Sequence, residues 1–163
     1  MEMQTDDKEI PPVLSTSISI SKAVIQKRVS KMFIRRALEA ALTACLAQQH
    51  VPYSTMPVEP YNLRLPYTPL AVANPTKVGH IEKAVVCAAN LGIKVNARSG
   101  GHSYVSAGLG GENGHLMIDM ANFASVAVDS HGIASVGTGA RLGAVAVALN
   151  NKGRGLSHGS CPG

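Results

Sequence analysis

The sequence predicts a mixed α+β fold in which short strands outnumber helices in the middle of the chain. Three patterns favour this class: apolar residues recur every three or four positions over residues 23–48, a second helical face spans residues 76–91 between two short apolar runs, and brief strand-like runs follow between residues 116 and 136. The same patterns leave an α/β class open as the alternative.

Composition excludes several classes of protein. Of the 163 residues 45% are hydrophobic and 15% are charged, with a net charge of +5, which is too apolar for a disordered chain and too mixed for a coiled coil. No apolar stretch approaches the ~20 residues that span a bilayer, so we expect no transmembrane helix. All 16 glycines lie from Gly79 onward, and most prolines lie between Pro52 and Pro75, so a glycine-free zone, a connector and a glycine-rich zone follow one another.

The N-terminal zone begins with a polar, acidic tail over residues 1–12, followed by residues 15–21, which fit either a strand or a disordered segment. The acidic start and the interrupted apolar pattern predict no secretory signal peptide. A helix over residues 23–48 ends at Val51 and Pro52. The stretch over residues 22–36 carries basic residues and no acid, which indicates a solvated helix face and, as a weaker alternative, a surface for nucleic acid or a partner. These residues are Lys22, Lys27, Arg28, Lys31, Arg35 and Arg36.

The glycine-rich zone opens with a β-α-β pattern. A strand over residues 70–73, a helix over residues 76–91 stopped by Gly92, and a strand over residues 93–97 predict a right-handed parallel connection. Further strands are expected over residues 116–120, 126–128 and 133–136. A last helix is expected over residues 142–150, closed by Gly153.

The segment after the second strand is the first candidate site. Adjacent glycines let successive backbone N–H groups point into one concavity, which suits a diphosphate, while serine hydroxyls and an arginine add donors and charge. An ordinary glycine turn with a surface histidine is the alternative. The residues are Arg98, Ser99, Gly100, Gly101, His102, Ser103 and Tyr104.

A second glycine loop lies between the last predicted strand and helix. Its G-x-G-x-x-x-G spacing differs from the dinucleotide fingerprint of a Rossmann domain, and no acidic residue follows Asp129, so a nicotinamide cofactor is disfavoured. The candidate residues of this loop are Gly137, Thr138, Gly139, Ala140 and Arg141.

The third candidate site is the C-terminal segment with His158, Gly159 and Cys161. A structural zinc site needs four ligands and usually paired cysteines; the chain has three cysteines and no C-x₂₋₄-C pair, so no metal site is predicted. A Cys–His nucleophilic dyad is chemically possible.

These three segments, together with residues 110–117, resemble the berberine bridge enzyme-like flavin oxidases. That group belongs to the superfamily of vanillyl-alcohol oxidase and p-cresol methylhydroxylase (PCMH), and the likeness is strongest to its fungal glucooligosaccharide oxidases. It covers residues 44–163, and the upstream residues 61–65 and 45–46 also fit.

The resemblance implies that the three segments bind FAD. It further implies a bicovalent flavin, attached through His102 to the 8α-methyl carbon and through Cys161 to C6, since imidazole nitrogen and thiolate are good nucleophiles near neutral pH. The fold implied is the N-terminal part of a PCMH-type FAD-binding domain over residues 44–163, preceded by an N-terminal extension, residues 1–43, made of the tail and the basic helix.

The family often carries a disulfide between its first helix and the helix of the β-α-β unit, which here implies a Cys45–Cys87 bond and an oxidising compartment. Many relatives are secreted, whereas this sequence shows no signal peptide, so the two indications of localisation conflict. Relatives also run to several hundred residues. We therefore expect the chain to be an N-terminal fragment, with the rest of the domain, the substrate domain and the catalytic base beyond residue 163.

The function implied is that of an FAD-dependent oxidoreductase, which transfers hydride from an alcohol or sugar carbon to the flavin, with O2 as oxidant and a small molecule or oligosaccharide as substrate. The alternatives are a secondary-metabolite oxidase acting on alkaloids or polyketides, and a truncated, non-catalytic flavoprotein remnant. We expect neither nucleic acid nor membrane as a partner, and we assign no catalytic acid or base.

Overall fold

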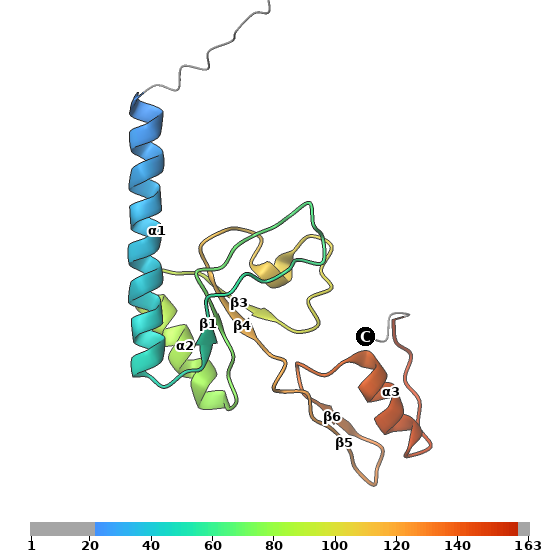
Figure 1. Cartoon of the computed structure of the whole chain (residues 1–163). Coiled ribbons are helices and arrows are strands. Elements are labelled where there is room, and N and C mark those ends of the chain that lie inside the picture. The colour runs from blue at the N-terminus through green and yellow to red at the C-terminus, as the bar shows by residue number, and fades with distance from the viewer. Residues whose placement is uncertain (1–21, 160–163) are drawn as a thin grey trace, which may run out of the picture.

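The computed structural model describes residues 22–159. Within them, two helices lie beside a small sheet, and a hairpin with a third helix forms a separate group at the other end (Figure 1). In chain order the elements are α1 (Lys22–Gln48), β1 (Tyr53–Ser54), β2 (Ala71–Ala73), α2 (Val78–Asn90), β3 (Val95–Arg98), the 3-10 helix η1 (Ala107–Leu109), β4 (Leu116–Asp119), β5 (Val126–Val128), β6 (Ala134–Val136) and α3 (Leu142–Asn150). None of these helices is long and apolar enough to cross a membrane.

The main sheet has four strands in the order β1-β2-β4-β3. Strands β2 and β3 both run parallel to β4, and β1 pairs antiparallel with β2. The two strands of the predicted β-α-β unit are therefore not neighbours, because β4 lies between them. This arrangement places β3, with Arg98 at its carboxyl end, at the edge of the sheet.

The larger core lies between this sheet and helices α1 and α2. Leu42 and Leu46 of α1 are fully buried, and they pack in one cluster with Ala84 and Ala88 of α2 and with Leu116 of β4. Each leucine buried in this way stabilises the fold by about 2 kcal/mol. The opposite face of the sheet has a smaller cluster, formed by Val72, Met117 and Leu109. Alternate residues of β2 and β4 thus face two different cores, which explains why both strands are buried along their length.

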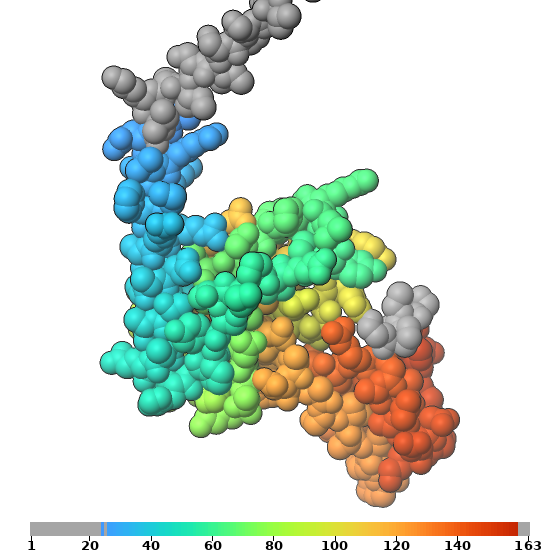
Figure 2. Space-filling model, in the orientation of Figure 1, coloured from blue at the N-terminus to red at the C-terminus, as the bar shows by residue number. Residues whose placement is uncertain are grey.

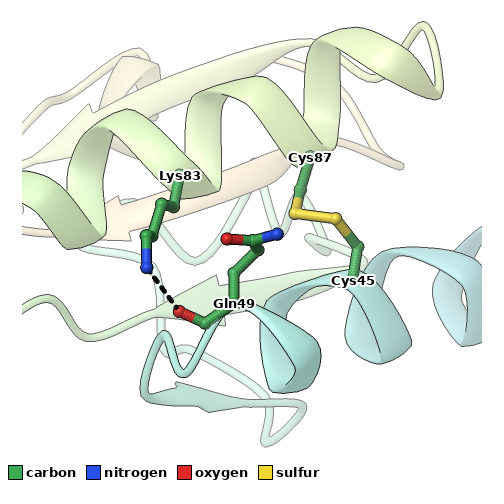
Figure 3. Close-up of a disulfide and its surroundings, with 4 residues drawn as sticks. All are labelled: Cys45, Gln49, Lys83 and Cys87. Carbon is green, nitrogen blue, oxygen red and sulfur yellow. Dashed lines mark hydrogen bonds between the residues drawn. A yellow bond between two sulfur atoms is a disulfide. The ribbon is translucent and has the colours of Figure 1, made fainter.

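A disulfide between Cys45 and Cys87 joins α1 to α2, with the two Cα atoms 5.8 Å apart (Figure 3). Beside it, the Lys83 ammonium donates a hydrogen bond of 3.3 Å to the Gln49 carbonyl oxygen, so a second contact links the same two segments. The disulfide implied by the family resemblance is confirmed.

Helix α1 stands clear of the rest of the molecule over its first turns (Figure 2), whereas Lys31 and Arg35 line an open hollow together with Leu70. Its described basic residues are all exposed, as expected for a solvated helix face. They are Lys27, Arg28, Lys31, Arg35 and Arg36. The expected boundary between the N-terminal extension, residues 1–43, and the domain over residues 44–163 falls inside this single helix. This division of the chain stays a prediction.

The second group consists of the antiparallel hairpin β5–β6 and helix α3. Backbone hydrogen bonds tie it to the segment that leaves the main sheet: the N–H of Gly137 donates to the Ser125 carbonyl at 2.8 Å, and the N–H of Gly139 donates to the Phe123 carbonyl at 3.0 Å. Both glycines belong to the second candidate loop, so this loop also joins the two parts of the fold.

The predicted helices and strands are confirmed, with ends displaced by a few residues. Gly92 and Gly153 have left-handed φ angles of 64° and 63°, as glycines that end helices require. Two elements were not predicted. Strand β1 has two residues and no periodicity, and η1 is a single turn, so neither leaves a pattern in the sequence. The tail over residues 1–12 and the undecided segment 15–21 lie outside the described residues.

Candidate functional site

The structure brings the first two candidate loops together. The Ser99 hydroxyl donates a hydrogen bond of 2.5 Å to the Thr138 carbonyl oxygen, and the Arg141 guanidinium donates one of 3.1 Å to the Gly100 carbonyl oxygen. These contacts bridge about forty positions of the sequence. The two glycine loops therefore form one continuous surface at the end of β3.

The backbone of the first loop carries unused donors. Among the described residues, no partner accepts a hydrogen bond from the N–H groups of residues 100–105. Gly101 has a φ of 79°, which an L-residue rarely adopts and which turns the chain sharply at this point. Consecutive free N–H groups around such a turn are the elements of an anion-binding nest.

Ser106, directly after these residues, adds a further unpaired group. It is buried, its φ is 52° although it is not glycine, and its hydroxyl has no partner among the described residues. A left-handed non-glycine residue stores strain, which is most often found at functional sites.

The half-buried side chain of Arg98 supports the loop. Its guanidinium forms an ion pair of 3.7 Å with Asp119 of β4, the residue opposite it in the sheet register. A Cβ added to Gly101 would lie 2.6 Å from the Arg98 Nε atom, so the arginine side chain lies directly against the turn. The positive charge of Arg98 is thus partly balanced by Asp119. The Arg141 side chain is exposed and contacts the same loop at the Gly100 carbonyl.

His102 and Tyr104 are exposed, whereas the Ser103 hydroxyl accepts a hydrogen bond of 3.0 Å from the Ala107 N–H. The Tyr61 ring lies 5.2 Å from the His102 ring and 5.4 Å from the Tyr104 ring, measured between centroids. The neighbouring Asn62 donates a hydrogen bond of 2.7 Å to the Tyr104 carbonyl oxygen.

The second loop packs closely on the segment that follows β4. A Cβ on Gly137 would overlap the Phe123 carbonyl oxygen, and a Cβ on Gly139 would overlap the Met120 carbonyl oxygen. Only glycine fits at these two positions. The close approach lets the Thr138 carbonyl reach the Ser99 hydroxyl. The Ala140 N–H donates to the Gly137 carbonyl at 3.0 Å and closes the turn that precedes α3.

The third candidate segment lies beside α3. His158 lines an open-sided groove of about 280 Å³, together with Val145, Leu149 and Leu156. The His158 Nδ1 atom lies 2.6 Å from the Gly159 carbonyl oxygen, and both residues are exposed. Cys161 lies outside the described residues. Among residues 22–159, no cluster of three or more histidine, cysteine or acidic side chains could hold a metal ion.

Sequence reasoning missed three residues that shape the site. Asp119 is paired with Arg98, and Tyr61 and Asn62 contact the His102 loop from the proline-rich connector. A lone asparagine in a connector leaves no local signal, because its partner Tyr104 is 42 positions away. In the sequence, residues 61–65 stand out only through the family resemblance.

The buried His115 is expected to make the free energy of unfolding depend on pH. Burial lowers the pKa of its imidazole, and the Glu112 backbone carbonyl, 2.9 Å from Nδ1, opposes this shift. Between pH 7.5 and 5.5 the unfolded chain, with a histidine pKa of about 6.5, takes up a proton more readily than the folded chain. We expect the free energy of unfolding to decrease over this interval, which urea unfolding at both values measures.

The variant His115→Gln is expected to show a smaller decrease than the wild type. The pKa of His80 is also lowered, by burial and by the nearby Lys77 and Lys83, but that residue is present in both proteins and cancels in the comparison. Equal decreases in the two proteins would show that His115 is not responsible.

Comparisons with known proteins agree with this geometry. The sequence profile described as "FAD binding domain" matches residues 69–162, which include both glycine loops and the C-terminal segment. The chain belongs to this family of FAD-binding domains. FAD is therefore its cofactor, and the family resemblance expected from the motifs is confirmed.

Individual relatives place the chain within this family. A carbohydrate oxidase of Microdochium nivale is 44% identical over 156 residues, which are 92% of this chain and 32% of that protein. The solved structure of a xylooligosaccharide oxidase from Myceliophthora thermophila, in complex with xylobiose, is 46% identical. It superposes with a TM-score of 0.71 over 75% of this chain and 28% of its own. A glucooligosaccharide oxidase from Acremonium strictum, described with a 6-S-cysteinyl, 8α-N1-histidyl FAD, is 39% identical with a TM-score of 0.70 over 75% and 27%.

The chain spans between about a fifth and a third of the length of the curated relatives it matches. The PCMH-type domain expected from the sequence is confirmed as a partial domain. Its residues suit the cofactor: the free N–H groups of residues 100–105 and the nearby Arg141 guanidinium match an anionic diphosphate.

Proposed function

We propose that this chain is the flavin-holding part of an FAD-dependent oxidoreductase that oxidises an alcohol carbon of a carbohydrate, with O2 as the final oxidant. The observation that carries the proposal is the surface formed by the two glycine loops, with unpaired N–H groups at residues 100–105, inside a matched FAD-binding domain. Four of the matched relatives are named as oxidases of carbohydrates or of xylo-, chito- or glucooligosaccharides, which favours an oligosaccharide over an alkaloid or polyketide substrate. Another, from Metarhizium anisopliae, is named only as an FAD-linked oxidoreductase.

Bound FAD supplies the two-electron chemistry by accepting a hydride from the substrate carbon. The residues of this chain bind and orient it. The N–H groups of residues 100–105 and the Arg141 guanidinium stabilise the negative charge of the diphosphate, and Ser99 holds the second loop against the first. No residue of this chain is proposed as the catalytic acid or base.

We further propose that His102 and Cys161 attach the flavin covalently. An imidazole nitrogen of His102 forms a bond to the 8α-methyl carbon; the methyl group and the imidazole each give up one hydrogen, and the two hydrogens with their electrons leave the flavin reduced. The bond between the Cys161 sulfur and C6 forms in the same way: the thiol and C6 each give up one hydrogen, and the flavin is again left reduced. Each time, O2 reoxidises the flavin and is reduced to H2O2. The exposed His102 ring and the linkages named for the Acremonium strictum enzyme support this proposal.

The attachment predicts a defined result with the His102→Ala variant. Wild-type protein loaded with FAD and precipitated with acid is expected to retain flavin on the peptides that contain His102 and Cys161. The variant is expected to retain it only on the Cys161 peptide, because alanine has no nucleophile. Peptide mass mapping measures both.

The double variant His102→Ala with Cys161→Ser is the control, and it should release all its FAD on precipitation while still binding it before. Complete release from the wild type would refute the covalent links and leave the FAD-binding domain intact. Failure of the wild type to bind FAD at all would instead show that this chain alone does not hold the cofactor. Release of H2O2 on addition of xylo- or chitooligosaccharides tests the activity.

Secretion is also proposed. The Cys45–Cys87 disulfide favours an oxidising compartment, because reducing compartments keep most thiols free. Detection of the protein in the culture medium of its source, with this disulfide intact, would support the proposal, and its retention inside the cell with free thiols would contradict it.

A further inference from the structure

Two residues of the proline-rich connector hold the loop that carries His102. The connector separates β1 from β2 and has no regular structure between residues 55 and 70. At Tyr61 and Asn62 it touches the first glycine loop, about forty positions away in the sequence. This contact is independent of the contact that the second glycine loop makes with Ser99 and Gly100.

Asn62 uses both ends of its side-chain amide. Its Oδ1 atom accepts a hydrogen bond of 3.1 Å from the Arg64 N–H, which closes a local turn, and its Nδ2 atom donates one of 2.7 Å to the Tyr104 carbonyl oxygen. The first bond fixes the orientation of the amide, and the second fixes the backbone two residues after His102. The Tyr104 carbonyl is thus paired, whereas the N–H groups of residues 100–105 have no acceptor among the described residues.

Tyr61 acts on the side chains of the same loop. Its ring meets the His102 ring at an interplanar angle of 55° and the Tyr104 ring at 78°, so it contacts both ring side chains of the loop. Such tilted and edge-on contacts are the preferred geometries of aromatic pairs. A ring against the imidazole restricts the rotamers that the exposed His102 side chain can adopt.

We infer that Tyr61 and Asn62 form a clamp that positions the His102 imidazole for bonding to the flavin. The inference rests on the proposed attachment at His102 and assigns Tyr61 and Asn62 as positioning residues for it. Bond formation requires the attacking nitrogen and the carbon to be held near contact distance and aligned, and a misplacement of about 1 Å slows such a step up to about a hundredfold. The clamp limits the movement of His102 both through the backbone and through the ring.

The test measures the rate at which acid-stable flavin accumulates on the His102 peptide, compared with the total FAD bound. Asn62→Asp has nearly the shape of asparagine and keeps the acceptor for the Arg64 N–H, but its carboxylate cannot donate to the Tyr104 carbonyl. Tyr61→Leu removes the ring, whereas Tyr61→Phe keeps it. We expect attachment to slow about tenfold or more in Asn62→Asp and Tyr61→Leu, and to stay near the wild-type rate in Tyr61→Phe.

Leu63→Ala is the matched control, because this side chain belongs to the same segment and is 70% exposed. It is expected to attach flavin at the wild-type rate. The flavin-free protein gives a second readout: the NMR signals of the His102 ring should shift in Tyr61→Leu, through loss of the tyrosine ring current, and should not shift in Leu63→Ala.

The outcomes separate this inference from the proposed function. Attachment at the wild-type rate in Asn62→Asp and Tyr61→Leu would overturn the clamp and leave the His102 linkage standing. Absence of attachment at His102 in the wild type would refute the linkage and the clamp with it. Slower attachment in these two variants with unchanged total FAD, together with wild-type rates in Tyr61→Phe and Leu63→Ala, would establish the positioning role.

Discussion

Replacing both Cys45 and Cys87 with alanine is expected to lower the free energy of unfolding by about 4 kcal/mol, according to the entropy of closing the loop between them. The bond spans 42 positions, and it joins α1 to α2 at the edge of the larger core, where Cys87 is buried. Without it the unfolded chain gains conformational freedom while the folded contacts stay almost the same. A loss of this size corresponds to a decrease of about 10 °C in Tm for a domain of this length.

Thermal unfolding followed by circular dichroism measures this effect. A reductant should lower the Tm of the wild type toward that of the double variant and should leave the variant unchanged. If the wild type keeps its Tm after complete reduction, the disulfide contributes little, and the packing of Leu42 and Leu46 is sufficient to hold α1.

Gly139→Ala is expected to destabilise the fold by about 3 kcal/mol, near the upper end of what overpacking costs. The added Cβ would overlap the Met120 carbonyl oxygen, which is backbone and cannot rotate away as a side chain could. The chain here is also held by the hydrogen bond from the Gly139 N–H to the Phe123 carbonyl, so relief of the overlap would break the link between the two parts of the fold. FAD binding should weaken as well, because the neighbouring Thr138 would move away from Ser99.

Gly79→Ala is the matched control for this substitution. Gly79 lies in the first turn of α2, and a Cβ there would meet no atom within 4 Å. Alanine at this site is expected to raise the free energy of unfolding by about 0.5–1 kcal/mol, since alanine is the better helix former. Urea unfolding of both variants measures the difference, and a loss below about 1 kcal/mol in Gly139→Ala would show that the backbone yields easily at the second loop.

The local structure of this chain could be predicted from its sequence wherever it depends only on residues a few positions apart. The apolar spacing of α2 and the glycine after it define a helix and its end, because both depend on residues a few positions apart. The loop around Gly100 and Gly101 could be identified for the same reason, since adjacent glycines alone permit the turn. The short strands were found from brief apolar runs, but the sequence did not show that β4 lies between β2 and β3.

The sequence by itself therefore determined the helices, most of the strands, the two glycine loops and, through the motifs, the family of FAD-binding domains. Only the tertiary structure decided that the loops touch each other, that Arg98 is paired with Asp119, and that Tyr61 and Asn62 hold the His102 loop. The physical reason is distance along the chain. These contacts join residues 21 to 42 positions apart, so they depend on how the sheet and the connector bring segments together rather than on any local pattern.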